Sequence, residues 1–265
     1  MDSSYITNGL QSALDSVTDK IKLVNDLIKV SPDQTGFWNI VSQVNDGVVA
    51  TALSIATILF LMSLVKESLD DKSDDYLKLI IKWFMRIIIT KGLIENSANI
   101  MMEIYKLGVK ACNGITANVT GLSNIKVEIP DKPEGTLQVL AALPKYKGIE
   151  LGIWFAGVII IVIVLGVMID VCLCTMFSPI AFAFFAYDGV DSIKNFLKNY
   201  LSLCLQGAYI MGSLTLFEVL LTSNILANYT SDSYFGELGL YIIYILVLIK
   251  ILISSGRKTK EILGM

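Results

Sequence analysis

Few side chains in this chain are placed for catalysis. The sequence contains no histidine, which removes the commonest general base and metal ligand. Its thiols include one close pair, Cys172 and Cys174, but residues two apart on a helix point to different faces. No phosphate-binding loop, dinucleotide fingerprint or metal-ligand spacing occurs. We therefore expect a protein that is not an enzyme and that holds no metal or cofactor.

Ionisable side chains inside apolar sequence are candidates of another kind. An acid or base within a membrane usually faces a bundle interior or water. Asp170 interrupts the longest apolar stretch, and it either faces such an interior or marks a kink or a boundary between two spans. Lys82 and Arg86 follow Lys78 at steps of four, which makes one cationic stripe on a helix. Glu218 lies about one turn from the end of its apolar run, close enough to reach water.

Helix breakers and small polar residues complete the candidates. Pro179 follows Ser178 inside apolar sequence, and Gln206 and Gly207 form a small polar face on a later apolar helix. We interpret Pro179 and Gly207 as packing devices rather than ligands. The residues to which we assign structural or pore-lining roles are Asp170, Pro179, Gln206, Gly207, Glu218, Lys82 and Arg86.

The composition predicts the class of protein that carries these residues. Hydrophobic residues make up 54% of the chain, charged residues only 17%, and the mean hydropathy is +0.64. Soluble domains have about a quarter charged residues. Residues 151–187 are apolar almost throughout, and about 20 such residues suffice to cross a bilayer as helix. We predict an all-α, polytopic membrane helical bundle. The net charge of −3 argues against a molecule-wide nucleic-acid-binding surface.

Residues 1–36 are predicted to contain an amphipathic helix that Ser31-Pro32 ends. Its apolar positions recur at steps of three and four, and the other face carries aspartates and lysines. Such a helix either lies in the membrane interface or packs on a neighbouring subunit or bundle, and we favour packing with some contact to the interface. The apolar stripe consists of Ile6, Leu10, Leu14, Val17, Ile21, Val24, Leu27 and Ile28.

Residues 37–111 are predicted to hold the first membrane helices. A span from Val44 to Val65 carries Ala52 and Ala56, a small-residue face suited to close helix packing. The charged segment that follows, from Lys66 to Asp75, is expected to be a solvated loop. Residues 76–111 are either an interfacial helix held by anionic headgroups or a span whose charged face is buried or wet. We favour an amphipathic start that leads into a crossing.

Residues 112–148 are rich in glycine, proline and asparagine, and we predict an irregular polar loop with a short strand over Ile125–Ile129. Residues 149–265 are predicted to form the membrane core. In it, 189–199 reads as a short interfacial helix and 200–222 as a span. The tail carries Arg257, Lys258 and Lys260, which predicts a cytoplasmic C-terminus.

The number of spans depends on the long apolar stretch, 151–187. If that stretch crosses once, there are about five transmembrane helices and the N-terminus is external. If it crosses twice, there are about six and the N-terminus is internal. We choose the five-span arrangement.

Three segments resemble a known family. They are Met176-Phe-Ser-Pro-Ile-Ala-Phe-Ala183, Asp191-Ser-Ile-Lys-Asn-Phe-Leu-Lys-Asn-Tyr200 and Gln206-Gly207-Ala208. Their order and hydropathy resemble the TrbL-type inner-membrane subunit of bacterial conjugative type IV secretion systems. The entry to the first span, Pro32 to Trp38-Asn39, is similar to the Gram-positive branch.

The resemblance implies a channel subunit that helps to pass single-stranded DNA with its relaxase across the cytoplasmic membrane. It also implies assembly with other secretion-channel subunits, a cytoplasmic ATPase and further copies of the chain, and it offers no catalytic residues. Two other functions stay open from the residues themselves. One is a small transporter or ion channel that acts alone, although no internal repeat is evident. The other is a membrane scaffold that holds a partner through the N-terminal helix.

Overall fold

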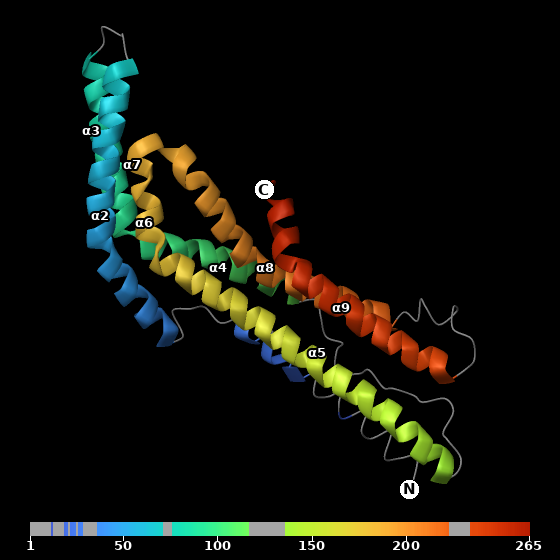
Figure 1. The fold of residues 1–265 in the computed structure, drawn as a ribbon. Helices are drawn as coiled ribbons and strands as arrows, with labels where there is room; N and C mark the ends of the chain where they lie inside the picture. The colour runs from blue at the N-terminus through green and yellow to red at the C-terminus, as the bar shows by residue number, and fades with distance from the viewer. Residues whose placement is uncertain are drawn as a thin grey trace. The chain divides into compact units, whose positions relative to one another are not determined.

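The computed structural model describes residues 36–70, 76–116, 136–222 and 234–265, with scattered helical positions between 12 and 28. All elements in this part of the chain are helices, and no strand occurs among the described residues (Figure 1). The predicted all-α fold is confirmed. The helices are α2 (Gly36–Asp70), α3 (Tyr76–Glu95), α4 (Ser97–Thr116), α5 (Thr136–Met176), α6 (Ser178–Ala183), α7 (Phe185–Asp188), α8 (Val190–Thr222) and α9 (Tyr234–Ile262).

Two of these helices are long and apolar enough to cross a membrane. They cover Gly36–Ser68 in α2 and Glu150–Met176 in α5. Only 17% of the apolar part of α2 and 22% of that of α5 are buried inside the chain, unlike the mostly buried central helix of a soluble domain. Apolar side chains on the outside of a helix need lipid or another apolar surface. The chain is a membrane helical bundle.

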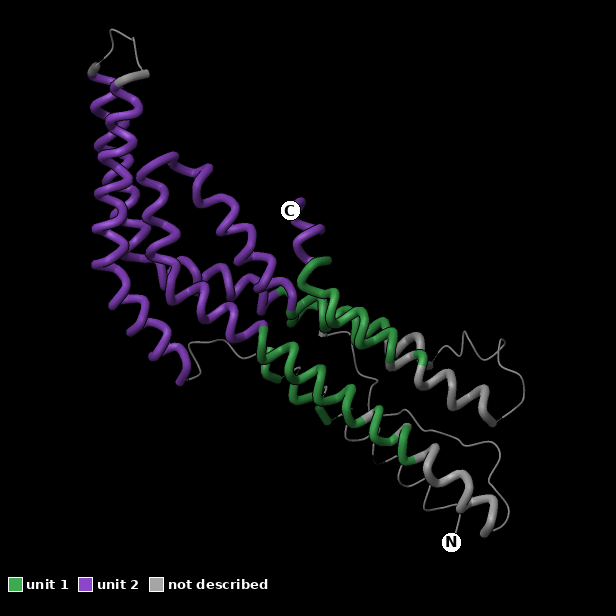
Figure 2. Tube along the Cα trace, in the orientation of Figure 1, with its two compact units in different colours: residues 1–29, 111–166, 207–258 green, residues 30–110, 167–206, 259–265 purple. Residues whose placement is uncertain are grey.

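The chain divides into two compact units, which Figure 2 shows in different colours. Unit 1 comprises residues 1–29, 111–166 and 207–258, and unit 2 comprises residues 30–110, 167–206 and 259–265. Each unit has its own cluster of buried apolar side chains.

In unit 1, the described part of the N-terminal segment packs on the membrane helices. Val24 and Ile28 are buried in one cluster with Ile160 of α5. Lys20 donates from Nζ to the carbonyl oxygen of Trp154 at 3.5 Å and lies 5.0 Å from the centre of its indole ring. These contacts agree with bundle packing of the amphipathic stripe. The stripe positions Ile6, Leu10, Leu14, Val17 and Ile21 lie outside the described residues.

In unit 2, α2 and α3 form an antiparallel hairpin against which α6 and α7 pack. Ala52 and Ala56 of α2 are buried in the same cluster as Phe182 and Ala183 of α6, as the small-residue face predicts. Small side chains let the two helix backbones approach closely, so apolar packing holds α6 on α2.

The expected irregular loop at 112–148 is shorter in the structure. Helix α4 continues to Thr116 and α5 begins at Thr136, ahead of Pro144. Residues 136–143, TLQVLAAL, are mostly good helix formers, and their propensity outweighs the proline that follows. The predicted strand over Ile125–Ile129 lies outside the described residues.

Two helix boundaries in the structure also differ from those predicted from the sequence. The single segment expected over 76–111 is interrupted at Asn96, whose side chain donates to the carbonyl oxygen of Gly92 at 2.9 Å. Conversely, the segments predicted as an interfacial helix at 189–199 and a span at 200–222 form one continuous helix, α8. No helix breaker separates them, so the lysines in the first turns do not end the helix.

Candidate functional site

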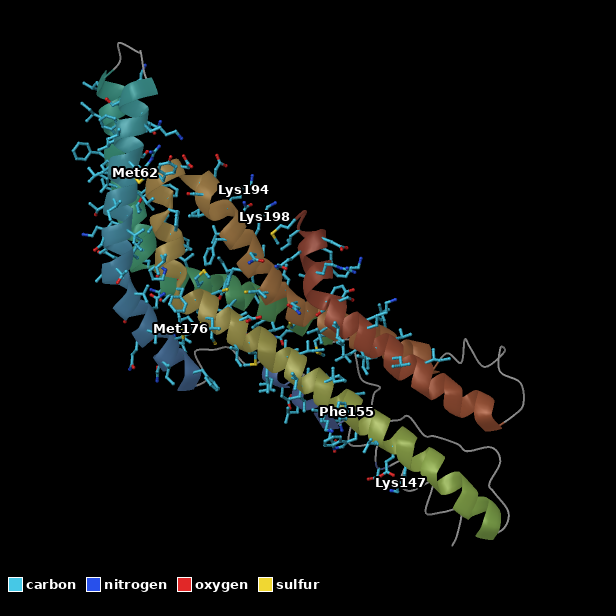
Figure 3. All side chains as sticks on the ribbon, viewed as in Figure 1. Met62, Lys147, Phe155, Met176, Lys194 and Lys198 are labelled. Carbon is cyan, nitrogen blue, oxygen red and sulfur yellow. The ribbon has the colours of Figure 1, made fainter. Side chains whose placement is uncertain are left out.

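The first polar site surrounds the break between α5 and α6. Helix α5 ends at Met176, which Figure 3 labels, and Phe177 precedes α6. Pro179 lies in the first turn of α6. A proline has no N–H, so the carbonyl oxygen four residues earlier, that of Thr175, loses its helical donor. Asn45 of α2 supplies a replacement, because its Nδ2 donates to this oxygen at 2.7 Å. Ser178 also donates to it, at 2.8 Å.

A network of buried hydrogen bonds extends from this break to two further helices. Ser97, the first residue of α4, donates to Oδ1 of Asn45 at 3.1 Å. On the other side, the hydroxyl of Thr175 lies 3.0 Å from that of Tyr200 in α8, and Tyr200 donates to the carbonyl oxygen of Met101 at 3.1 Å. Ser97 and Thr175 are completely buried, and Asn45 and Tyr200 are nearly so. Satisfied networks of this kind fix one arrangement of the helices that they join.

The second polar site lies at the other end of the α2–α3 hairpin. Glu67 of α2 accepts hydrogen bonds from three side chains of α3: Nη2 of Arg86 at 2.9 Å, Nζ of Lys82 at 3.2 Å and Nε1 of Trp83 at 2.8 Å. The predicted cationic stripe therefore faces a carboxylate on the neighbouring helix. Arg86 is mostly buried, whereas Lys82 is exposed, so the Glu67–Arg86 pair is the stronger of the two.

Arg86 also holds the end of α7. Its Nη1 donates to the hydroxyl oxygen of Ser63 and, at 3.2 Å, to the carbonyl oxygen of Tyr187, which accepts from Ser63 at 3.0 Å as well. The last carbonyls of a helix have no donor within the helix, and a cation there is favourable. Nearby, Nζ of Lys66 lies 3.8 Å from Asp188 and 5.2 Å from the ring centre of Tyr187. The segment from α6 to α7 is thus held by the hairpin at both ends.

Comparison with known families identifies the chain that carries these sites. Residues 17–179 match the model of the TrbL/VirB6 plasmid conjugal transfer like protein family. The chain belongs to this family. Neither the curated proteins nor the solved structures contain a match. The region shared with the TrbL/VirB6 family includes Asn45, Glu67, Arg86 and the Ser178-Pro179 break, so both polar sites lie mostly within it.

The other predicted site residues of this TrbL/VirB6-like chain do not gather with these two sites. Asp170 lies exposed on α5, one turn before Cys174. Gln206 is buried in α8. Gly207 faces the N-terminal segment, since a Cβ placed there would lie 3.0 Å from Cγ2 of Ile28. Glu218 lies in α8, but its side chain is outside the described residues. Pro179, Lys82 and Arg86 are thus the predicted residues that the two polar sites contain.

Sequence reasoning missed the partners of these residues. Glu67 was assigned to a solvated loop, but α2 continues to Asp70 and Glu67 accepts from Arg86. One signal was present in the sequence: a carboxylate two residues beyond an apolar run, before a helix with a cationic stripe. Among the described residues, no group of acids and cysteines is arranged to hold a metal ion. The arrangement joins and positions helices.

Proposed function

We propose that this chain is a structural channel subunit of a conjugative type IV secretion machine. In this role it helps to pass single-stranded DNA with its relaxase across the cytoplasmic membrane, and it performs no catalytic step of its own. Its partners are further copies of the chain, other membrane subunits of the channel and a cytoplasmic ATPase. The observation that carries the proposal is the family match over residues 17–179.

The structure supports a scaffolding role in several ways. The polar contacts of the two sites join helices to one another. Asn45 donates to the carbonyl oxygen that Pro179 leaves without a helical donor, and Glu67 pairs with Arg86. Meanwhile, large apolar side chains such as Ile58, Phe84 and Ile88 are exposed on α2 and α3. A well-fixed interior with extensive outer apolar surface is what a membrane subunit within a larger assembly requires.

We further propose that the chain crosses the membrane about five times, with a cytoplasmic C-terminus. The contact between Lys66 and Asp188 supports this arrangement, because it requires the end of α2 and the end of α7 to lie on one side of the membrane. The chain must then cross an even number of times between them. One crossing by 76–111 and one by 151–187 meet this condition, whereas the six-span alternative adds a third and does not.

A transporter or ion channel that acts alone is the competing function. It would conduct or transport as a purified protein in liposomes, whereas a structural subunit would be silent there. A membrane scaffold that holds a partner through its N-terminal helix is the other competitor. Deleting residues 1–30 would then abolish assembly but leave membrane insertion intact.

Transfer from a donor cell that lacks this chain tests the proposal. We expect DNA transfer to fall to background in the deletion donor and to return when the full chain is supplied from a second locus. The relaxase should still nick its DNA in the deletion donor, because nicking precedes transport. Normal transfer without the chain would refute the proposal. Loss of nicking as well as transfer would point to an earlier role than the channel.

A further inference from the structure

The charged residues of α2 indicate how deeply each part of the α2–α3 hairpin lies in the membrane. Helix α2 contains no charged residue between Asp46 and Lys66. These residues span about 28 Å as helix, and a bilayer core is about 30 Å thick. The charge-free part of α2 therefore matches the hydrocarbon layer, within the membrane-spanning segment Gly36–Ser68.

Contacts made by α2 show which part of α3 lies at the same depth in the membrane. Arg86 contacts Ser63 near one end of the charge-free part of α2. Ser97, the first residue of α4, contacts Asn45 at the other end. The part of α3 from Arg86 to its end at Glu95 consequently lies alongside the part of α2 that the hydrocarbon layer surrounds.

This stretch of α3 exposes an ion pair. Phe84, Ile88, Lys91 and Glu95 recur at steps of three and four, so they share one outward face. All four are exposed, and Nζ of Lys91 lies 3.6 Å from the carboxylate of Glu95. The apolar face of α3 thus gives way to charges at a depth where α2 has none. Ionisable groups at such a depth face a protein interior or water rather than lipid.

The exposed charges continue along α4. Met101 and Tyr105 on one face of α4 are buried, and on the other face Glu103 pairs with Lys106 at 2.8 Å. We use the name polar stripe for the exposed and half-buried polar residues that follow one another along the two helices. They are Lys91, Glu95, Asn99, Glu103, Lys106 and Lys110.

We propose that the polar stripe is covered by water within the assembled machine and forms part of the wall of its aqueous passage. This inference rests on the proposed channel function and assigns a face of the chain to it. The stripe carries lysines next to glutamates, so little net charge faces the passage. Such a wall suits a polyanion that must leave as well as enter, because strong binding would stop transport.

Thiol accessibility in membranes that contain the whole machine tests this inference. Single cysteines would replace Lys91 and Glu95 in a chain without its four native cysteines. Ile58→Cys is the matched control, since Ile58 is exposed on α2 at a depth between the same contacts. The probe is a charged, membrane-impermeant methanethiosulfonate, applied to permeabilised cells so that both membrane faces are reached.

We expect the cysteines at positions 91 and 95 to react at least about tenfold faster than the cysteine at position 58, because a thiolate forms only in contact with water. Equally slow reaction at all three positions would overturn the inference, since protein or lipid would then cover the stripe. Equally fast reaction would overturn it too, because the hairpin would then lie outside the bilayer.

DNA transfer measured on the same strains separates this inference from the proposed function. A reactive stripe in a strain whose transfer does not need the chain would refute the channel function and leave only the contact of the stripe with water. An unreactive stripe in a strain whose transfer does need the chain would refute only the inference that water covers the polar stripe.

Discussion

Asn45 donates a hydrogen bond from Nδ2 to the carbonyl oxygen of Thr175, 2.7 Å away, across 130 residues of sequence. This is the oxygen from which Pro179 withholds a helical donor. Burying such an oxygen without a partner would cost about 1–3 kcal/mol. The amide of Asn45 and the hydroxyl of Ser178 together replace that donor, and Asn45 also ties α2 to the interrupted helix.

Replacing Asn45 should destabilise the protein. We expect Asn45→Ala to lower the free energy of unfolding by about 1–3 kcal/mol, because the Thr175 oxygen and the Ser97 hydroxyl both lose a buried partner. Thermal unfolding in detergent would measure the loss. Asn39→Ala, at an exposed position of the same helix, is the control and should change little. Equal stability of the two variants would contradict the role given to Asn45.

Replacing the proline should reduce the need for Asn45. In Pro179→Ala the new N–H can donate to the Thr175 oxygen. We expect Asn45→Ala to cost less in that background than in the native chain, by roughly 0.5–3 kcal/mol, the range found for residues that share a partner. A double-mutant cycle of unfolding free energies measures this coupling. Strictly additive effects would mean that the two residues do not serve the same oxygen.

The charge pair at the other end of the hairpin should behave as a partly buried one. We expect Glu67→Ala and Arg86→Ala to be coupled by more than about 1 kcal/mol, because each leaves a charged group with unmet hydrogen bonds. The exposed pair Lys91–Glu95 is the control and should show a coupling of about 0.5 kcal/mol or less. Similar coupling in both pairs would show that burial of Arg86 does not matter.

A single glycine should control the contact between α4 and α8. A Cβ placed on Gly108 would lie 2.4 Å from the carbonyl oxygen of Cys204, which is backbone and has no room to move. Gly108→Ala is therefore expected to destabilise the protein, although alanine favours a helix. Gly212→Ala, where no atom lies within 4 Å, should be neutral or stabilising by up to about 1 kcal/mol. Unfolding temperatures of both variants check this, and the opposite order would refute the close contact.

The five-span arrangement predicts a pattern of thiol labelling from outside intact cells. Single cysteines at Ser4, Ser123 and Ser231 should react with an impermeant reagent, whereas one at Ser192 should react only after permeabilisation. Protection of Ser4 together with labelling of Ser231 would require an even number of spans and would contradict the arrangement.

Composition and hydropathy were sufficient to predict the class of fold, since apolar runs in α2 and α5 are local features of the sequence. Ala52 and Ala56 could also be predicted, because small residues one turn apart mark a packing face. The partners of Pro179 and Arg86 could not. Asn45 and Glu67 reach them from other helices, and a sequence pattern within one helix does not reveal which neighbour supplies the missing donor or acceptor.

The misassigned boundaries have other causes. Asn96 interrupts 76–111 through a bond to Gly92, a local preference that competes weakly with the helix. Helix α8 continues through Lys194 and Lys198, both labelled in Figure 3, because no helix breaker follows them, and Lys198 donates to the carbonyl oxygen of Leu263 at 3.4 Å. Charges that indicate a membrane boundary in sequence are in this case accommodated within one helix.

We propose above all that DNA passes along this chain. Recovery of DNA crosslinked to the chain during transfer tests this most directly. Donors in the act of transfer would be treated with formaldehyde, and the chain would be precipitated through a tag. The account predicts that the transferred strand is recovered, and that it is lost in a donor whose relaxase cannot nick. Efficient transfer with no strand recovered above that relaxase-deficient background would contradict it.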